Sequence, residues 1–229
     1  IAELIVRSTP EKATAYRSIC ALGEHEAQNG NFVFAFYEMC KMATERFPSL
    51  SQADLARLMF IGTFTAWQTG RLQHDNGRPI KRAALQELVG LSRQKFGEFY
   101  SRLIGENILS EDETGDIYVN PSVFYRGEID NCEYDLSGYQ HTRMFRKTVR
   151  ELYEKYGKGN TARQLAIVYA VLPFVNFYTN VVCFNPDERN EDAIKPMNLE
   201  KLAALLGYQS TRKLSAALSA IKLDDQPVF

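Results

Sequence analysis

The chain has 229 residues, of which 45% are apolar and 24% are charged, and its formal net charge is −1. This composition is typical of a globular protein and excludes a largely disordered chain. The near-zero charge excludes a polycation, so any affinity for nucleic acid has to come from where the charges lie. The length suffices for one large domain or for two ordinary ones.

The cysteines and histidines indicate neither a metal site nor a cofactor. The four cysteines and three histidines are scattered, without the CxxC or HxxxH spacing of metal ligands. Scattered thiols are typical of a cytosolic protein, so we expect a cytoplasmic location. The most apolar stretch, residues 165–182, is interrupted by Pro173 and Asn176 and falls short of the roughly 18 apolar residues of a membrane span. We therefore expect no membrane association, and no signal peptide is recognisable.

The N-terminal region, residues 1–30, is predicted to be a helical extension. Pro10 suits the first turn of a helix over about Glu11–Ala27. Phenylalanines then alternate over residues 32–36 as in a short strand, although the spacing that follows also fits a helix. Of the two, we favour a helix over Met39–Phe47.

The next segment has the pattern of a helix-turn-helix. Leu50–Gly70 is predicted to be a helix with a broad apolar face. After a polar turn, a second helix over Ile80–Val89 is stopped by Gly90. Ser92 can cap a third helix over about Arg93–Glu106. Two helices joined by a tight glycine turn, the second with polar residues at its start, are typical of a DNA-reading unit.

A β-hairpin is predicted to follow. Residues 108–110 and 116–119 have the pattern of two short strands around a polar turn over residues 111–115. A hairpin after a recognition helix is the wing of a winged helix, so we assign residues 31–129 to a first winged-helix domain. The turn is acidic, and we expect it to stay off DNA or to meet a protein partner.

The rest of the chain is predicted to repeat this layout. Residues 130–160 form a basic connector that is helical over Thr142–Tyr156, and residues 161–229 form a second winged-helix-like domain. An apolar helix opens this domain, and the final recognition helix spans about Ser210–Ile221. Its wing is expected to start at residue 227 and to be truncated. The predicted fold is thus mainly α with small β wings, an α+β class with two helix-turn-helix units joined by a connector helix.

The charges are segregated along the chain. Residues 71–102 hold seven basic and three acidic side chains, a formal charge of +4. Residues 143–163 hold seven basic and two acidic side chains, a formal charge of +5. Residues 105–135 hold nine acids and one arginine, a formal −8. Phosphate contacts supply most non-specific affinity for DNA, so we expect the basic blocks to face it. The alternative is that these charges are simply solvated, and that the basic connector only neutralises the acidic block.

The predicted DNA contacts are polar side chains at the start of each recognition helix and cations near them. Arg and Gln can each make two hydrogen bonds to a purine edge, and a helix N-terminus presents N–H groups to phosphate. In the first unit and the connector they are Ser92, Arg93, Gln94, Lys95, Arg102, Arg82, Arg146, Lys147 and Arg150. In the second unit they are Gln209, Thr211, Arg212 and Lys213.

Three motifs of the first unit are shared with a known family. They are the aromatic run over residues 32–38, the Gly-Leu-Ser-Arg-Gln turn over residues 90–94, and the segment Ile117–Gly127 with its Asn-Pro and Tyr-Arg-Gly sequences. In these motifs, residues 32–129 resemble the RepL-like winged-helix replication proteins of Gram-positive plasmids and phages. The resemblance implies binding to a replication origin, and it carries over residues 92–94 and 120–127 as family features. The second helix-turn-helix looks more like the two-winged-helix initiators of other plasmids, or a phage repressor.

No catalytic motif stands out, so we do not expect an enzyme. Residues 157–161 lack the spacing of a GxxxxGK[ST] phosphate loop, and GxSxG and HExxH do not occur. The acidic residues over 187–192 lie in a predicted loop, where such residues are usually solvated. A nicking initiator needs a His-x-His metal site, which three scattered histidines cannot supply.

The amino-acid sequence is compatible with three functions. The first is sequence-specific binding of double-stranded DNA by a plasmid or phage replication initiator, which recognises origin repeats and recruits host replication proteins. The second is a transcriptional regulator such as a phage or plasmid repressor. The third is a phage winged-helix protein that binds a host protein. The sequence leaves open whether the protein is a homodimer.

Overall fold

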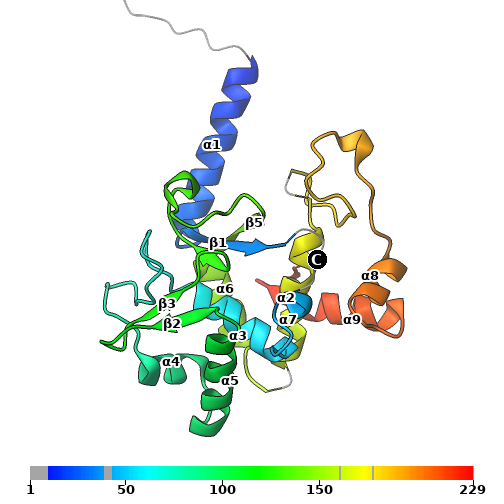
Figure 1. Ribbon diagram of the computed structural model, residues 1–229. Helices are drawn as coiled ribbons and strands as arrows, with labels where there is room; N and C mark the ends of the chain where they lie inside the picture. The colour runs from blue at the N-terminus through cyan, green and yellow to red at the C-terminus, as the bar shows by residue number, and fades with distance from the viewer. Residues whose placement is uncertain (1–9, 39–42, 160, 177, 229) are drawn as a thin grey trace, which may run out of the picture.

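The computed structural model describes residues 10–38, 43–159, 161–176 and 178–228. It has mixed α and β structure, with helices around a three-stranded antiparallel sheet and two small hairpins (Figure 1). The α-helices are α1 (Pro10–Gln28), α2 (Ala43–Arg46), α3 (Gln52–Gly62), α4 (Arg82–Val89), α5 (Arg93–Gly105), α6 (Arg146–Tyr156), α7 (Thr161–Val171), α8 (Leu199–Leu205) and α9 (Thr211–Ala220). The strands are β1 (Phe32–Tyr37), β2 (Leu109–Glu111), β3 (Ile117–Val119), β4 (Phe124–Tyr125), β5 (Gln140–Phe145), β6 (Lys222–Leu223) and β7 (Gln226–Pro227).

The three-stranded sheet has β1 at its centre, with β4 and β5 antiparallel to it on either side. The alternating phenylalanines of residues 32–36 therefore do mark a strand. Val33 and Ala35 of β1, together with Met144 of β5, are buried in the core. The helix favoured over Met39–Phe47 is seen only as the short α2, and residues 39–42 lie outside the described residues.

The segment expected to be a connector is part of the core, so this expectation is wrong. Residues 140–145 pair with β1, and the helix expected from Thr142 begins only at Arg146. Helix α6 then packs against both α3 and α7. One hydrophobic cluster extends from Val33 to Ile221. Strand pairing and helix packing thus join the parts of the chain that the sequence suggested were separate.

The first helix-turn-helix segment forms largely as predicted. Gly90 adopts the left-handed conformation with φ of 67° and ends α4 by donating its N–H to the carbonyls of Gln86 and Glu87. Helix α5 follows at once, and the hairpin β2–β3 follows α5. Arg71 forms a further antiparallel bridge to Tyr118 of β3. The order is therefore helix, short extended segment, helix, turn, helix and hairpin.

Helix α3 ends at Gly62, eight residues before the predicted end at Gly70. Local hydrogen bonds explain the early stop, because the hydroxyls of Thr63 and Thr65 donate to the carbonyls of Phe60 and Gly62. Trp67, which belongs to the segment predicted to be helical, lies beyond the end of α3 and is 53% exposed.

The second helix-turn-helix segment has the same order of elements. Helix α7 is followed by bridges at residues 175–183, then by α8, a turn at Gly207 and α9. The expected start of its wing at residue 227 is wrong, because β6 and β7 already pair within residues 222–227. Asp224 and Asp225 form the two-residue loop, both with positive φ, as a hairpin turn requires.

The contact between α3 and the sheet yields a stability prediction at Gly62. A Cβ at this position would lie 2.7 Å from the ring of Phe124, which is 1% exposed and cannot move aside easily. We expect Gly62→Ala to lower the free energy of unfolding by about 1–3 kcal/mol. Urea unfolding followed by circular dichroism measures the change.

The matched control is Gly97→Ala in the interior of α5, where a Cβ would meet nothing within 4 Å. This substitution should stabilise the fold by roughly 0.5–1 kcal/mol, because alanine loses less backbone entropy than glycine in a helix. Equal effects of the two substitutions would contradict the close approach of α3 and β4.

Candidate nucleic-acid interface

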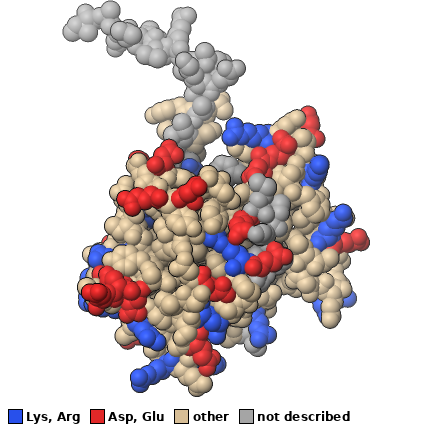
Figure 2. Space-filling model, viewed as in Figure 1, with Lys and Arg blue, Asp and Glu red and all other residues tan. Residues whose placement is uncertain are grey.

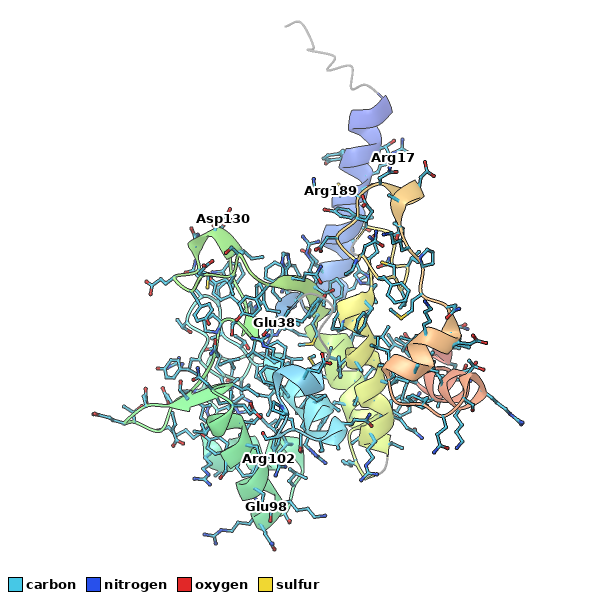
Figure 3. The ribbon with its side chains drawn as sticks, turned by 45° about the vertical axis from the view of Figure 1, so that its right-hand side comes forward. Arg17, Glu38, Glu98, Arg102, Asp130 and Arg189 are labelled. Carbon is cyan, nitrogen blue, oxygen red and sulfur yellow. The ribbon has the colours of Figure 1, made fainter. Side chains whose placement is uncertain are left out.

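Helix α5 presents its polar face to solvent. Phe96, Phe99 and Leu103 are at most 2% exposed and fix the opposite face to the core. The exposed positions of its first two turns are those of Ser92, Arg93, Gln94, Lys95 and Glu98. In Figure 3 the helix projects from the lower edge of the molecule, with Glu98 near its free end and Arg102 closer to the body. The side chains predicted to read DNA are thus accessible.

The N-terminus of α5 is open to an anion. Ser92 is the N-cap residue, but its hydroxyl makes no capping hydrogen bond to the helix. The first N–H groups of a helix have no partner within the helix, and they carry the positive end of its dipole. These donors are therefore available to a phosphate oxygen.

A cationic hollow of about 430 Å³ lies beside this N-terminus. Its charged lining residues are Arg57 of α3, Lys95 of α5 and Arg163 of α7, and no acidic residue of the described chain lines it. Sequence reasoning missed Arg57 and Arg163, because they are far from α5 in the chain and only helix packing brings them there. The hollow places three cations next to the free N–H groups of α5.

Arg102 has a different environment from the one predicted. Its guanidinium donates to Asp54 at 3.0 Å and is only 33% exposed. Asp54 is 3% exposed, also pairs with Arg57 at 2.9 Å, and forms a capping box with Ser51 at the start of α3. Arg102 therefore fixes α5 to α3 instead of extending toward a ligand.

Arg146 and Arg150, both predicted DNA contacts, bind groups within the protein instead of extending into solvent. Arg146 is 8% exposed, donates to the carbonyl of Thr63 at 2.7 Å and pairs with Asp75. Arg150 donates to Asp75 at 2.6 Å and stacks on the ring of Phe64 at 4.1 Å. These cations hold α6 against the segment that follows α3, so they are not free for phosphate.

The remaining predicted contacts are exposed but spread out. Lys147 is 59% exposed and lies 3.9 Å from Glu151. Arg82 on α4 is exposed, with its guanidinium 4.8 Å from the ring centre of Tyr100. Neither belongs to the hollow beside α5.

Helix α9 carries the predicted residues of the second unit. Ser210 caps the helix by accepting from the N–H of Lys213, whose Nζ donates to Gln209 at 2.8 Å. Arg212 is exposed and Thr211 is half-buried. Figure 1 shows α9 at the right and α5 at the lower left, with α3 and α7 between them. The two groups of predicted residues therefore form separate surfaces.

The hairpin β2–β3 has an acidic, ordered tip. Asp112 accepts hydrogen bonds from the N–H and hydroxyl of Thr114 and from the N–H of Asp116. The hydroxyl of Thr114 is the main cause that lowers the pKa of Asp112. Figure 2 shows this acidic group at the left edge, where Figure 1 draws the hairpin. A fixed negative tip is unfavourable next to phosphate.

The described residues contain no group of three or more His, Cys, Asp or Glu side chains that could hold a metal ion. Cys20, Cys132 and Cys183 are free thiols, and Cys40 lies outside the described residues. No described helix is long and apolar enough to cross a membrane.

Comparisons with known proteins identify no relative: no protein family, curated protein or solved structure matches this chain.

The Asp75 network predicts a pH-dependent contribution to stability. Its pKa is lowered, chiefly by the hydrogen bond from Arg150. A carboxyl with a lower pKa in the folded than in the unfolded chain stabilises the fold above the unfolded pKa, and this contribution is lost as the pH falls through the folded pKa. Because the Asp75 side chain is 61% exposed, we expect Asp75→Asn to lower the free energy of unfolding at neutral pH by only about 1 kcal/mol.

Urea unfolding of both proteins at a series of pH values tests this. The difference between them should shrink toward zero in acid, once Asp75 is protonated in both states. The exposed Asp130→Asn is the control and should change little at any pH. A difference for Asp75→Asn that is constant from neutral to strongly acidic pH would rule out the charged network as its source.

Proposed function

We propose that the protein binds double-stranded DNA in a sequence-dependent manner, with α5 as its recognition helix. The observation that carries the proposal is the exposed N-terminal half of α5 beside a hollow with three cations. The major groove of B-DNA, roughly 12 Å wide, admits one α-helix. Arg93 and Gln94 are of the residue types that make paired hydrogen bonds to purine edges.

The phosphate contacts of this proposal come from two helices. Lys95 and the free N–H groups lie on α5 and Arg163 on α7, whereas Arg57 of α3 lines the hollow but is paired with Asp54. Phosphate contacts fix the register of a protein on the duplex, and base contacts supply specificity. Rigid helices on both sides of the hollow would thus hold α5 at a defined depth in the groove.

The order of elements supports a winged-helix assignment for this unit. In a winged helix a short strand lies between the first two helices and pairs with the hairpin after the third. The bridge between Arg71 and Tyr118 has this position. Residues 161–228 repeat the order with α7, α8, α9 and the β6–β7 hairpin. The acidic tip of the first hairpin differs from a wing that lies on phosphate, so this wing would point away from the duplex.

The biological role we favour is initiation of plasmid or phage replication at origin repeats. Its support is the resemblance of residues 32–129 to RepL-like proteins. A transcriptional repressor would use the same helix. Footprinting on DNA from the neighbourhood of the gene separates the two, because repeated sites at an origin favour initiation and sites over a promoter favour repression.

A host protein as the partner is the second candidate, and the acidic tip of the β2–β3 hairpin is the observation that favours it. Charged residues are depleted at the core of protein interfaces and occur at the polar rim. The acidic tip would therefore lie at the rim, opposite a basic surface of the partner. An absence of any gel shift with duplex DNA at low salt would favour this function over the first.

The double variant Arg93→Ala plus Lys95→Ala tests the recognition helix. We expect it to weaken binding to the footprinted site by about tenfold or more and to reduce the dependence of affinity on salt. Fluorescence anisotropy with a labelled duplex at several salt concentrations gives both quantities. The control is Lys155→Ala plus Lys195→Ala, which removes the same charge from exposed positions outside the hollow. An unchanged salt slope for the first variant would contradict the placement of α5.

Arg163→Ala tests the contribution of α7 to phosphate binding. It should lower the slope of log affinity against log salt by about one and weaken binding to all duplex sequences alike. The DNA sequence that the protein prefers should not change, because Arg163 is proposed to contact the phosphate backbone of DNA and not the bases. Arg189→Ala, an exposed arginine outside the hollow, is the control. A change of preferred sequence in Arg163→Ala would place this residue on bases instead.

A further inference from the structure

The outer face of the three-stranded sheet is only partly covered. The segment 129–139 packs over the end that carries Phe36. The last turn of α1 covers the other end, where the ring of His25 meets that of Phe145 at 4.5 Å. Between the two lies a hollow of about 610 Å³. This size is within the roughly 300–1,000 Å³ of small-molecule sites.

Aromatic rings form the floor and one rim of this hollow. Phe32 and Phe34 of β1 line it, with ring centres 5.0 Å apart, and His141 of β5 lies 5.1 Å from Phe34. Trp67, whose side chain is 53% exposed, stands at the rim. An exposed tryptophan beside a sheet face with aromatic rings is a surface on which a flat ring can stack.

Arg126 and Arg143 also line this hollow. The Nε atoms of Arg126 and Arg143 are buried and have no hydrogen-bond partner within the described part of the chain. Arg143 lies over Phe32 and is 4.0 Å from Glu26, whereas Arg126 lies 6.0 Å from the ring centre of Trp67. Because these Nε atoms are buried, an anion in the hollow would be held by the terminal nitrogens of the two guanidinium groups.

Charged groups of both signs line the hollow. Burial, and after it the neighbouring Arg146 guanidinium, lowers the pKa of Arg126. Three carboxylates are part of the lining: Glu26 beside Arg143, Glu128, which accepts a hydrogen bond from the amide of Asn131, and the exposed Asp130. The hollow thus combines ring faces with two guanidinium groups, and an anion bound there has to lie on the side of Arg126 and Arg143.

We propose that this hollow binds an unpaired nucleotide, whose base stacks on Trp67 and the β1 phenylalanines and whose phosphate is held by Arg126 and Arg143. A duplex does not fit this chemistry, because its base faces are covered by their neighbours in the stack. Proteins that bind single strands combine aromatic platforms with cations in this way. The nucleotide can be free or part of a single strand, and the experiment separates these two sources.

Trp67 is the single tryptophan of the chain, so its fluorescence reports on the hollow directly. The full chain is titrated with dAMP, with deoxyadenosine, which lacks the phosphate, and with a short single-stranded oligodeoxynucleotide. We expect dAMP or the strand to quench the emission, and deoxyadenosine to bind about tenfold more weakly than dAMP. Stronger binding of the strand than of dAMP assigns the site to single strands, and the reverse assigns it to free nucleotides. An absence of quenching by both dAMP and the strand overturns the proposal.

Two variants, measured by calorimetry with the tighter of the two ligands, test the residues. Trp67→Ala and Arg126→Gln should each weaken binding by about tenfold. Because Trp67 is exposed, we expect Trp67→Ala to keep the fold. If thermal unfolding shows that Arg126→Gln is unstable, the binding affinity of Trp67→Ala alone tests the proposal. The matched controls are Phe184→Ala, an exposed aromatic residue elsewhere, and Arg78→Gln, an exposed arginine outside both proposed sites. Equal losses in variants and controls overturn the assignment.

The two proposals can fail separately. The double variant at Arg93 and Lys95 should lose duplex binding and keep nucleotide binding, whereas Trp67→Ala should do the opposite. Loss of both activities in Trp67→Ala overturns the proposal of a separate nucleotide site.

Discussion

Helix α3 is buried over most of its length, and packing around it positions its neighbours. From Asp54 to Gly62 every residue of this helix except Arg57 is buried. The helix contacts α4, α6 and α7, and its last glycine lies against Phe124 of the sheet. Protein interiors are close-packed, so a helix surrounded on all sides fixes the positions of its neighbours. The two helix-turn-helix segments are joined here, by the contact of α3 with α7.

Two carboxylates determine which arginines are left for a ligand. Asp54 pairs with Arg57 and Arg102, and Asp75 pairs with Arg146 and Arg150. A charged group that loses water needs a partner, and a carboxylate with two oxygens can accept from two guanidinium groups. Arginines near these acids therefore hold helices together. The net charge of a chain segment does not reveal this division.

The two proposed surfaces differ in chemistry. The α5 surface offers flexible cationic and amide side chains and free helix N–H groups, which suit groove edges and phosphates. The sheet hollow offers ring faces and half-buried guanidinium groups, which suit one unstacked base. Since neither surface uses the side chains of the other, a protein with both would hold a duplex and an unpaired nucleotide at the same time.

The local elements of residues 82–119 could be predicted from the amino-acid sequence. The apolar spacing of α5, the turn at Gly90 and the hairpin after α5 depend on residues within one or two turns of each other, and their patterns are visible in the chain. The exposed positions at the start of α5 follow from the same spacing. The true end of α3 was missed because side-chain hydrogen bonds of Thr63 and Thr65 override its apolar pattern.

Tertiary packing determines which distant residues meet. It paired β5 with β1, where a connector was predicted, because strand pairing depends on contacts more than a hundred residues apart. It buried Arg146 and brought Arg163 to the N-terminus of α5, although both lie in the same basic block of the sequence. Their environments differ because α6 faces Asp75 whereas the start of α7 faces α5, and this depends on how the helices pack and not on local spacing.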